Sequence, residues 1–132
     1  MSIVIKNIKK GFGKFPALNN VSLQVKEGEF VALLGPSGSG KTTLLRIIAG
    51  LEWPDEGEIY LEGVDAAGKA TRERKIGFVF QHFALFKHMN VFENIAFGLR
   101  LKTPKISENE IRLRVESLLK LVHLSGSEQK YP

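Results

Sequence analysis

A glycine-rich segment placed directly after an apolar run constrains the fold of this chain more than any other feature. Residues 35–42 read Gly-Pro-Ser-Gly-Ser-Gly-Lys-Thr, and the five residues before them, 30–34, are all apolar. An unbroken apolar run is typical of a parallel strand covered on both faces, and the glycines and proline cannot continue that strand. A helix is expected over residues 41–49, with Gly50 as its C-terminal stop. Strand, loop and helix in this order predict an α/β fold.

The same segment contains the residue types that bind the phosphates of a nucleotide, in the spacing of a P-loop. Glycines let several backbone amides converge on phosphate oxygens, and the start of the helix adds positive partial charge. Lys41 is expected to bind the β- and γ-phosphates, and the Thr42 hydroxyl to coordinate Mg²⁺. A chance glycine turn is the alternative, but the flanking strand and helix favour a phosphate site. The predicted cofactor-binding residues of this loop are Gly35, Pro36, Ser37, Gly38, Ser39, Gly40, Lys41, Thr42 and Thr43.

The remaining pattern predicts further strands around this loop and helices after it. Alternating or continuous apolar residues predict strands at 2–8, 21–25, 58–61 and 76–80, and a polar loop over 63–75. Helices are expected over 90–101, where Thr103-Pro104 ends the pattern, and from Ser107 onward. Ser107 and Glu110 are predicted to form a capping box. One face of that last helix is expected to carry Ile111, Val115, Leu118, Leu119 and Val122.

Composition and charge exclude several classes of protein. The chain has no cysteine, so it has neither a disulfide framework nor a thiolate metal site. Its apolar stretches are far shorter than a membrane span, and its first ten residues lack the apolar core of a signal peptide. The net charge of +5 suits a polyanionic ligand or a solvated basic surface equally well. Nucleic acid is not expected as a partner, because no basic helix has base-reading spacing.

Taken together, these landmarks resemble the ATP-binding subunits of ABC transporters over the whole chain. Residues 35–46 and 48–51 match the phosphate loop and helix of that family almost letter for letter, and Phe78-Val79-Phe80-Gln81 resembles its Q-loop strand and glutamine. The resemblance implies a P-loop NTPase of the ABC type. It would have an N-terminal antiparallel β part, an incomplete RecA-like core and the start of a helical subdomain. The chain would be a partial nucleotide-binding domain. Residues 1–81 would form its β part, phosphate loop and Q-loop strand, and residues 82–132 would form the Q-loop and the start of the helical subdomain.

The resemblance also implies roles for individual residues. Phe12 stands where the family places an aromatic side chain that stacks on adenine, although here it is Phe rather than the commoner Tyr. A phenyl ring keeps the π-face needed for stacking. The sequence alone favours a core or loop aromatic at Phe12, and only the resemblance favours stacking. Gln81 would contact Mg²⁺ or the attacking water, so Lys41 and Gln81 are the predicted catalytic residues, and Thr42 and Gln81 the metal-binding ones. The implied cofactors are ATP and Mg²⁺.

The partners follow from the same resemblance. Phe83, Phe86 and Phe92 flank a loop where the family receives a short helix from integral-membrane permease subunits. A second ATPase subunit is implied as a homodimer partner, at the cytoplasmic face of the plasma membrane, where the protein is peripheral. Residues 81–100 are most similar to the sulfate/thiosulfate importers of the family, with the molybdate, sugar and polyamine importers as close alternatives.

Several parts of the hydrolytic machinery are not found in the sequence. The family's signature motif, its Walker B strand with a carboxylate pair and its switch histidine are not convincingly present. Residues 124–129 resemble a damaged signature but are interpreted as a loop. We therefore expect the N-terminal portion of a longer ATPase subunit, with a gap in its central sheet. Alone it should fold poorly and be inactive in hydrolysis. A different P-loop NTPase and a truncated ATP-binding fragment remain as alternatives.

Overall fold

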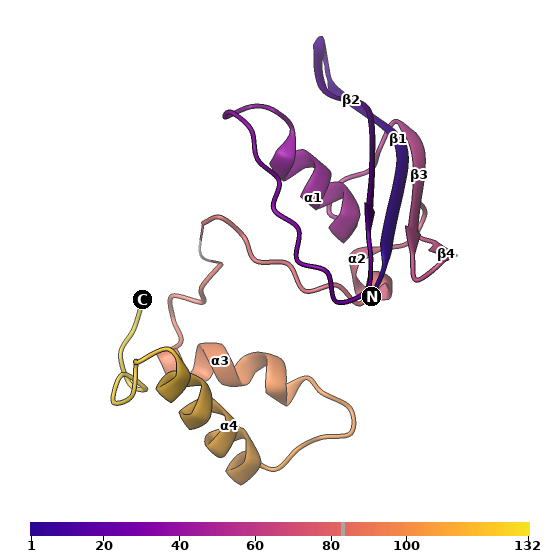
Figure 1. Ribbon diagram of the computed structural model, residues 1–132. Coiled ribbons are helices and arrows are strands. Elements are labelled where there is room, and N and C mark those ends of the chain that lie inside the picture. Colours follow the sequence, from indigo (N-terminus) through magenta and orange to yellow (C-terminus); the bar gives the residue numbers. More distant parts are fainter. Residues whose placement is uncertain (83) are drawn as a thin grey trace. The chain divides into compact units, whose positions relative to one another are not determined.

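The structure, a computed structural model, describes residues 1–82 and 84–132. The chain divides into two compact units, Met1–Phe78 and Val79–Pro132, and each is described by itself. The elements (Figure 1) are strands β1 (Ile3–Phe12), β2 (Phe15–Val25), β3 (Glu56–Leu61) and β4 (Val64–Asp65), and helices α1 (Lys41–Ala49), α2 (Thr71–Arg74), α3 (Val91–Arg100) and α4 (Glu108–Leu121). Within the described residues, no helix is long and apolar enough to cross a membrane.

The first unit is an antiparallel sheet with α1 packed against it (Figure 1). The strand order is β2-β1-β3-β4, and every neighbouring pair is antiparallel. Alternation along the strands turns one set of apolar side chains towards α1, as the period of two predicts. The core of the unit consists of Ile5, Ile8, Leu18, Leu44, Ile47, Ile48, Ile59, Leu61 and Ala66. The strands predicted near residues 2–8, 21–25 and 58–61 are confirmed, and β1 and β2 extend further towards each other than predicted.

Two predicted strands, at residues 30–34 and 76–80, are wrong: neither segment is a strand in the structure. Phe30 and Leu34 are 95% and 91% exposed, and only Leu33 of that run packs against the core. A parallel strand requires neighbouring strands to satisfy its backbone groups, and the sheet described is entirely antiparallel. A cavity of about 310 Å³ lies beside Leu33 and Leu34, so the core is not closed on this side. Apolar composition alone therefore did not produce a strand.

The segment 63–75, predicted as a loop, contains β4, α2 and a buried arginine. The Arg74 side chain is only 4% exposed. Its guanidinium donates to the carbonyls of Ile47 (2.6 Å) and Ile48 (2.9 Å), which belong to the last turn of α1. Burial lowers the pKa of Arg74 below its ordinary value, although a guanidinium stays charged in proteins. The arginine thus satisfies carbonyl groups that every helix end leaves without a partner.

Gly50 follows α1 in the left-handed conformation that the predicted helix stop requires, with a φ of 73°. A Cβ atom at Gly50 would lie 2.7 Å from Nε of Arg74. Glycine is therefore needed here for two reasons, the backbone angle and the close approach of the guanidinium. The prediction of a helix over residues 41–49 is confirmed.

The second unit is a pair of helices, α3 and α4, that share a small core. Ala96 of α3 packs with Ile111, Val115 and Leu119 of α4. Of the apolar face predicted for α4, Leu118 and Val122 are exposed in the structure. At 100° per residue both lie within the same stripe as the buried residues, and Val122 is the C-cap residue that follows the end of α4.

The N-terminus of α4 shows half of the predicted capping box. The hydroxyl of Ser107 accepts from the Glu110 amide at 3.2 Å. The Glu110 carboxylate instead accepts from Arg114 one turn later, at 2.6 Å. A charged partner at i+4 competes with the neutral backbone amide for the same carboxylate, and here it prevails.

Candidate functional site

The phosphate-loop segment, residues 35–42, has the backbone that its glycines predict. Gly35, Gly38 and Gly40 have φ angles of 153°, 80° and 87°, which L-residues rarely adopt. A Cβ atom at Gly40 would lie 2.4 Å from the carbonyl oxygen of Ala17 on β2. At Gly38 a Cβ would meet nothing within 4 Å, so only the backbone angle selects glycine there. The loop therefore passes directly against β2 before it enters α1.

The N-terminus of α1 presents backbone amides that have no hydrogen-bond acceptor within the helix. Its first hydrogen bond runs from the Leu44 amide to the Gly40 carbonyl (2.8 Å), so the amides of Lys41, Thr42 and Thr43 lie outside the ladder. The N-cap residue is Gly40, which has no side chain to accept from them, and the first turn has no acidic residue. Amides and helix dipole together make this end a binding site for an anion.

The other long helices differ from α1 at this end. Asn90 caps α3 by accepting from the Glu93 amide at 2.8 Å, and Ser107 caps α4. Two further amides of α3, those of Val91 and Phe92, donate to carbonyls of residues 128 and 130. Among the three long helices of the described chain, α1 is therefore the one whose first turn has neither a side-chain cap nor an acidic residue.

Lys41 lies across the phosphate loop rather than extending into solvent. Its ammonium donates to the carbonyls of Gly35 (2.7 Å) and Pro36 (2.6 Å) and to the hydroxyl of Ser39 (3.0 Å). These acceptors are neutral, and no carboxylate pairs with Lys41 among the described residues. Its positive charge is therefore placed at the loop without being neutralised. Such a charge attracts an anionic ligand to the same amides.

The remaining predicted loop residues are accessible. Ser37 and Thr42 are exposed, and Thr43 is half-buried. The Thr42 hydroxyl is thus open to solvent at the first turn of α1, where a metal ion on a bound phosphate could reach it. Within the described part of the chain, no group of three or more His, Asp or Glu residues converges to bind a metal ion.

Phe12 lies at the tip of the β1–β2 hairpin and is not a core residue. Its side chain is 49% exposed, and its register partner Phe15 is 81% exposed. The ammonium of Lys10 lies 5.3 Å from the centroid of the Phe12 ring, within the range of a cation–π contact. The hairpin that carries Phe12 is also the one that touches the phosphate loop, through Ala17. A half-exposed aromatic face is the geometry that base stacking requires.

Lys10 also forms a charged cluster with Glu52 and Asp55 that the sequence did not reveal. The Lys10 side chain is 12% exposed, and its Nζ lies 3.0 Å from Glu52 and 3.2 Å from Asp55. The hydrogen bond to Glu52 raises the pKa of Lys10. The pKa of Asp55 is lowered, mainly by the hydrogen bond from the Gly11 amide and next by the hydrogen bond from Lys10. No sequence signal identifies this cluster, because Lys10 is more than forty residues away from both carboxylates.

The residues predicted in the second unit are placed as follows. Gln81 is exposed. Phe83 lies outside the described residues. Phe86 is 39% exposed, and its ring centroid lies 4.7 Å from that of Phe97, whereas Phe92 packs against the α3–α4 core. Of the two described phenylalanines predicted to line a docking surface, Phe86 is exposed and Phe92 is half-buried.

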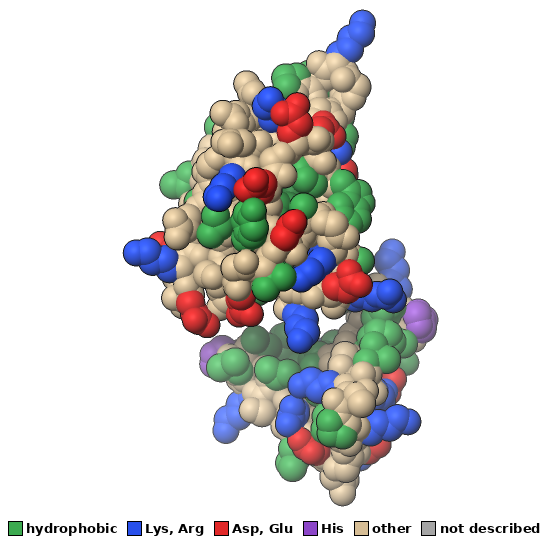
Figure 2. Space-filling model, turned by 90° about the vertical axis from the view of Figure 1, so that its right-hand side faces the viewer, with side chains coloured by type: hydrophobic (Ala, Val, Ile, Leu, Met, Phe, Trp, Pro, Cys, Tyr) green, Lys and Arg blue, Asp and Glu red, His purple; other side chains and the backbone are tan. Residues whose placement is uncertain are grey.

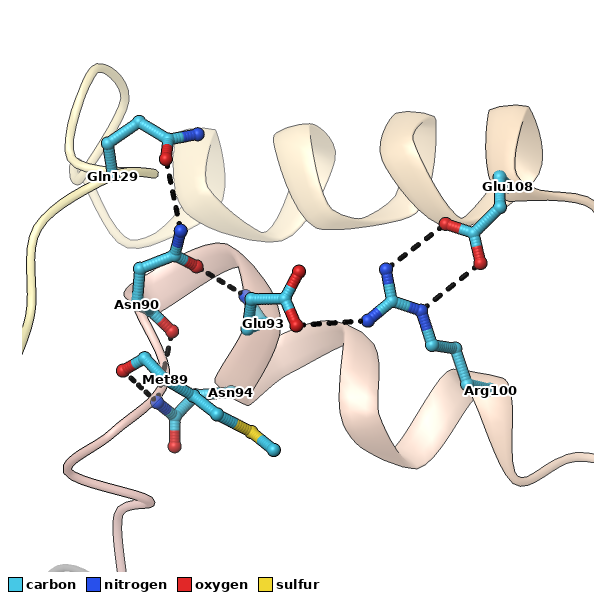
Figure 3. Close-up of polar contacts among 7 residues, drawn as sticks. All are labelled: Met89, Asn90, Glu93, Asn94, Arg100, Glu108 and Gln129. Atoms are coloured by element: carbon cyan, nitrogen blue, oxygen red, sulfur yellow. Dashed lines mark hydrogen bonds and ion pairs between the residues drawn. The ribbon is translucent and has the colours of Figure 1, made fainter.

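Asn94, which was not predicted from the sequence as a structural or functional residue, holds the segment before α3 through hydrogen bonds of its side chain (Figure 3). Its side-chain amide donates to the carbonyls of Phe86 (3.1 Å), Met89 (2.9 Å) and Asn90 (3.0 Å). Its oxygen accepts from the Phe86 amide at 2.9 Å. The Asn90 amide group also donates to Gln129 at 3.0 Å. One turn of α3 thus fixes both the segment bearing Phe86 and the segment around Gln129.

On the face that Figure 2 shows, basic and acidic side chains lie interspersed rather than in a patch of one sign. Lys6–Glu58 and Lys9–Glu56 are ion pairs between side chains of β1 and β3.

Comparison with known proteins places these features in a family. The profile described as "ABC transporter" matches residues 18–132. The chain is 61% identical to the sulfate/thiosulfate import ATP-binding protein CysA of Rhodopseudomonas palustris. The alignment covers the whole of this chain and 38% of that relative. The proteins of the same name from Acinetobacter baylyi and Neisseria meningitidis are 62% and 59% identical, with the same coverage. The chain therefore spans about 38% of the length of these curated relatives.

Solved structures agree with the profile match. The dimeric structure of a post-hydrolysis state of the ATP-binding cassette MJ0796, bound to ADP and Pi, is 37% identical, with a TM-score of 0.87. The alignment covers 98% of this chain and 61% of that one. A second dimeric structure of MJ0796, described as a bacterial ABC transporter cassette, has a TM-score of 0.88.

Proposed function

The chain belongs to the ABC transporter family, and from this membership we propose that it is the ATP-binding part of an importer ATPase. The complete subunit couples ATP binding and hydrolysis to the import of sulfate or thiosulfate through a membrane permease. The names of the relatives support this substrate over molybdate, sugars or polyamines. The observation that carries the proposal is the open first turn of α1, with the uncompensated charge of Lys41 beside it.

The residues present fit Mg-ATP as the ligand. Amides of the first turn of α1 bind phosphate oxygens, and the Lys41 ammonium moves from the loop carbonyls to the β- and γ-phosphates. The glycines keep side chains out of this cradle, since a Cβ at Gly35 would meet Ser39 Oγ at 2.9 Å. The Thr42 hydroxyl is the protein ligand of Mg²⁺, with Gln81 as the second. When bound, Mg²⁺ neutralises the charge that develops on the transferred phosphoryl group.

Phe12 provides the base contact in this proposal. The accessible face of its ring stacks on adenine while the phosphates lie at the loop that the same hairpin touches. Base–aromatic stacking is tolerant of sequence and contributes about 1–3 kcal/mol per base. Phe12 therefore adds affinity for the nucleoside, and the loop adds affinity for the triphosphate.

Hydrolysis requires a positioned water as well as stabilised phosphoryl charge. Lys41 supplies the charge, and Gln81 contacts Mg²⁺ or the water. The signature motif, Walker B carboxylates and switch histidine of the family are not recognisable in this sequence. We therefore propose that the 132-residue chain by itself turns over little ATP. The complete subunit is active as a homodimer.

The partner is an integral-membrane permease, and the subunit works peripherally at the cytoplasmic face of the plasma membrane. Its docking surface includes Phe86, whose ring is accessible and lies against that of Phe97 with the two planes tilted by 50°. Two hydrogen bonds of Asn94 hold the amide and the carbonyl of Phe86, and two more hold the carbonyls of Met89 and Asn90, so this aromatic surface is preorganised for a partner. Phe92 supports the surface from the α3–α4 core.

The test combines nucleotide binding with transport. Lys41→Ala is expected to abolish binding of Mg-ATP in calorimetry and uptake of labelled sulfate in cells that depend on this protein. Lys102→Ala removes the same charge from the second unit and is expected to change neither measurement. Unchanged ATP binding in Lys41→Ala would refute the site. Intact ATP binding with uptake of molybdate but not sulfate would refute the substrate alone.

A further inference from the structure

The tip of the β1–β2 hairpin extends beyond the strand on its other side. Pairing between β1 and β3 ends at Lys9 and Glu56, so β1 continues towards Phe12 without a strand along that edge. Within the hairpin, Gly11 lies opposite Pro16, which has no amide hydrogen to donate. The backbone next to Phe12 is therefore weakly supported by strand pairing on both sides.

Asp55 takes the place of the missing strand. Its own amide donates to the carbonyl of Lys9 at 2.9 Å, and its carboxylate accepts from the Gly11 amide at 2.7 Å. The side chain thus continues the ladder of β3 by one hydrogen bond, up to the residue before Phe12. A bond from an amide to a carboxylate is stronger than one between two neutral groups.

Lys10 connects this carboxylate to the aromatic ring. Its ammonium binds Asp55 and Glu52 and lies 5.3 Å from the centroid of the Phe12 ring. The Lys10 side chain is 12% exposed, whereas that of the neighbouring Lys9, which pairs with Glu56, is 45% exposed. A largely buried ammonium with two carboxylate partners, such as that of Lys10, is held in one conformation, whereas an exposed ion pair, such as that of Lys9, samples many conformations.

We propose that Asp55 and Lys10 are positioning residues that fix the Phe12 ring for contact with the base of a bound nucleotide. This inference rests on the proposed function, in which Phe12 stacks on adenine. Asp55 sets the backbone of the hairpin tip, and Lys10 restricts the ring by lying against it. The hairpin tip then loses less conformational entropy when a nucleotide binds.

The experiment compares a ligand that has a base with one that has none. Affinities for Mg-ATP and for magnesium tripolyphosphate are measured by calorimetry on the full-length protein as the cell makes it. Asp55→Ala is expected to weaken Mg-ATP binding by about threefold to tenfold, and Phe12→Ala by about tenfold, within the range for loss of one base–aromatic stack. Both variants should keep the wild-type affinity for tripolyphosphate within about twofold.

Two further variants separate positioning from general stability. Asp55→Asn keeps an acceptor for the Gly11 amide and is expected to lose less affinity for Mg-ATP than Asp55→Ala. Glu56→Ala removes the adjacent carboxylate, which pairs with Lys9 at the surface, and is expected to bind both ligands as the wild type does.

The outcomes distinguish the inference from the proposed function. Equal losses for both ligands in Asp55→Ala, or an equal effect of Glu56→Ala, would overturn the positioning inference. A loss in Phe12→Ala without one in Asp55→Ala would overturn it too, and leave the adenine contact intact. If Phe12→Ala changes neither affinity, the adenine contact itself is wrong and the inference falls with it.

Discussion

Replacing Arg74 by alanine tests whether a buried side chain stabilises the helix that follows the phosphate loop. The guanidinium donates to four carbonyls, two in the last turn of α1 and two between β4 and α2. In the variant, the carbonyl of Ile48 loses the guanidinium as its donor in a buried site, whereas the carbonyl of Ile47 still accepts from the Gly50 amide at 3.1 Å. A buried polar group left without a partner costs about 1–3 kcal/mol.

The expected loss in the free energy of unfolding is therefore about 1–3 kcal/mol, because the four hydrogen bonds share one side chain and are not additive. With a urea m-value of about 2 kcal/mol/M, the unfolding midpoint should fall by about 0.5–1.5 M. Trp53, the one tryptophan of the chain, lies 5.9 Å from the guanidinium and reports unfolding by its fluorescence.

Arg72→Ala is the matched control, since it removes an exposed arginine of the same helix, α2. Its effect is expected within about 0.5 kcal/mol, as for most surface substitutions. Should Arg74→Ala shift the midpoint no further than Arg72→Ala, the reasoning about the buried carbonyls would be refuted.

Three further results are expected. Gly40→Ala places a Cβ against the backbone of β2 and should abolish Mg-ATP binding in calorimetry, with Gly68→Ala, whose site is open, unaffected. Asn94→Ala removes four hydrogen bonds before α3 and should speed amide hydrogen exchange at Phe86 by about tenfold or more; unchanged exchange would contradict it. The pKa of Asp55 is lowered by folding, so its contribution to stability is full above its unfolded pKa of about 4 and is lost as pH falls further. In acid titrations, Asp55→Ala should therefore flatten the stability curve below about pH 4, and an unaltered curve would count against the cluster with Lys10.

Features that depend on neighbours in the sequence could be predicted from the sequence. The loop glycines, the helix over residues 41–49 and its stop at Gly50 follow from backbone angles and capping, which act within a few residues. The helices α3 and α4 were predicted in the same way, from the helical spacing of apolar residues and from the residues that end a helix. The resemblance to ABC transporters rested on these local motifs, and the family profile agrees with it.

Features that depend on distant partners required the tertiary structure. The apolar runs at 30–34 and 76–80 have strand composition, but a strand also needs a neighbouring strand, and the sheet provides none for them. Arg74 reads as a polar loop residue and becomes buried only because α1 ends beside it, 26 residues earlier in the chain. Asp55 reaches Gly11 across 44 residues. The sequence thus determined the local conformation of the phosphate loop and its chemistry, whereas chain packing decided which side chains support it, because such contacts leave no short-range pattern.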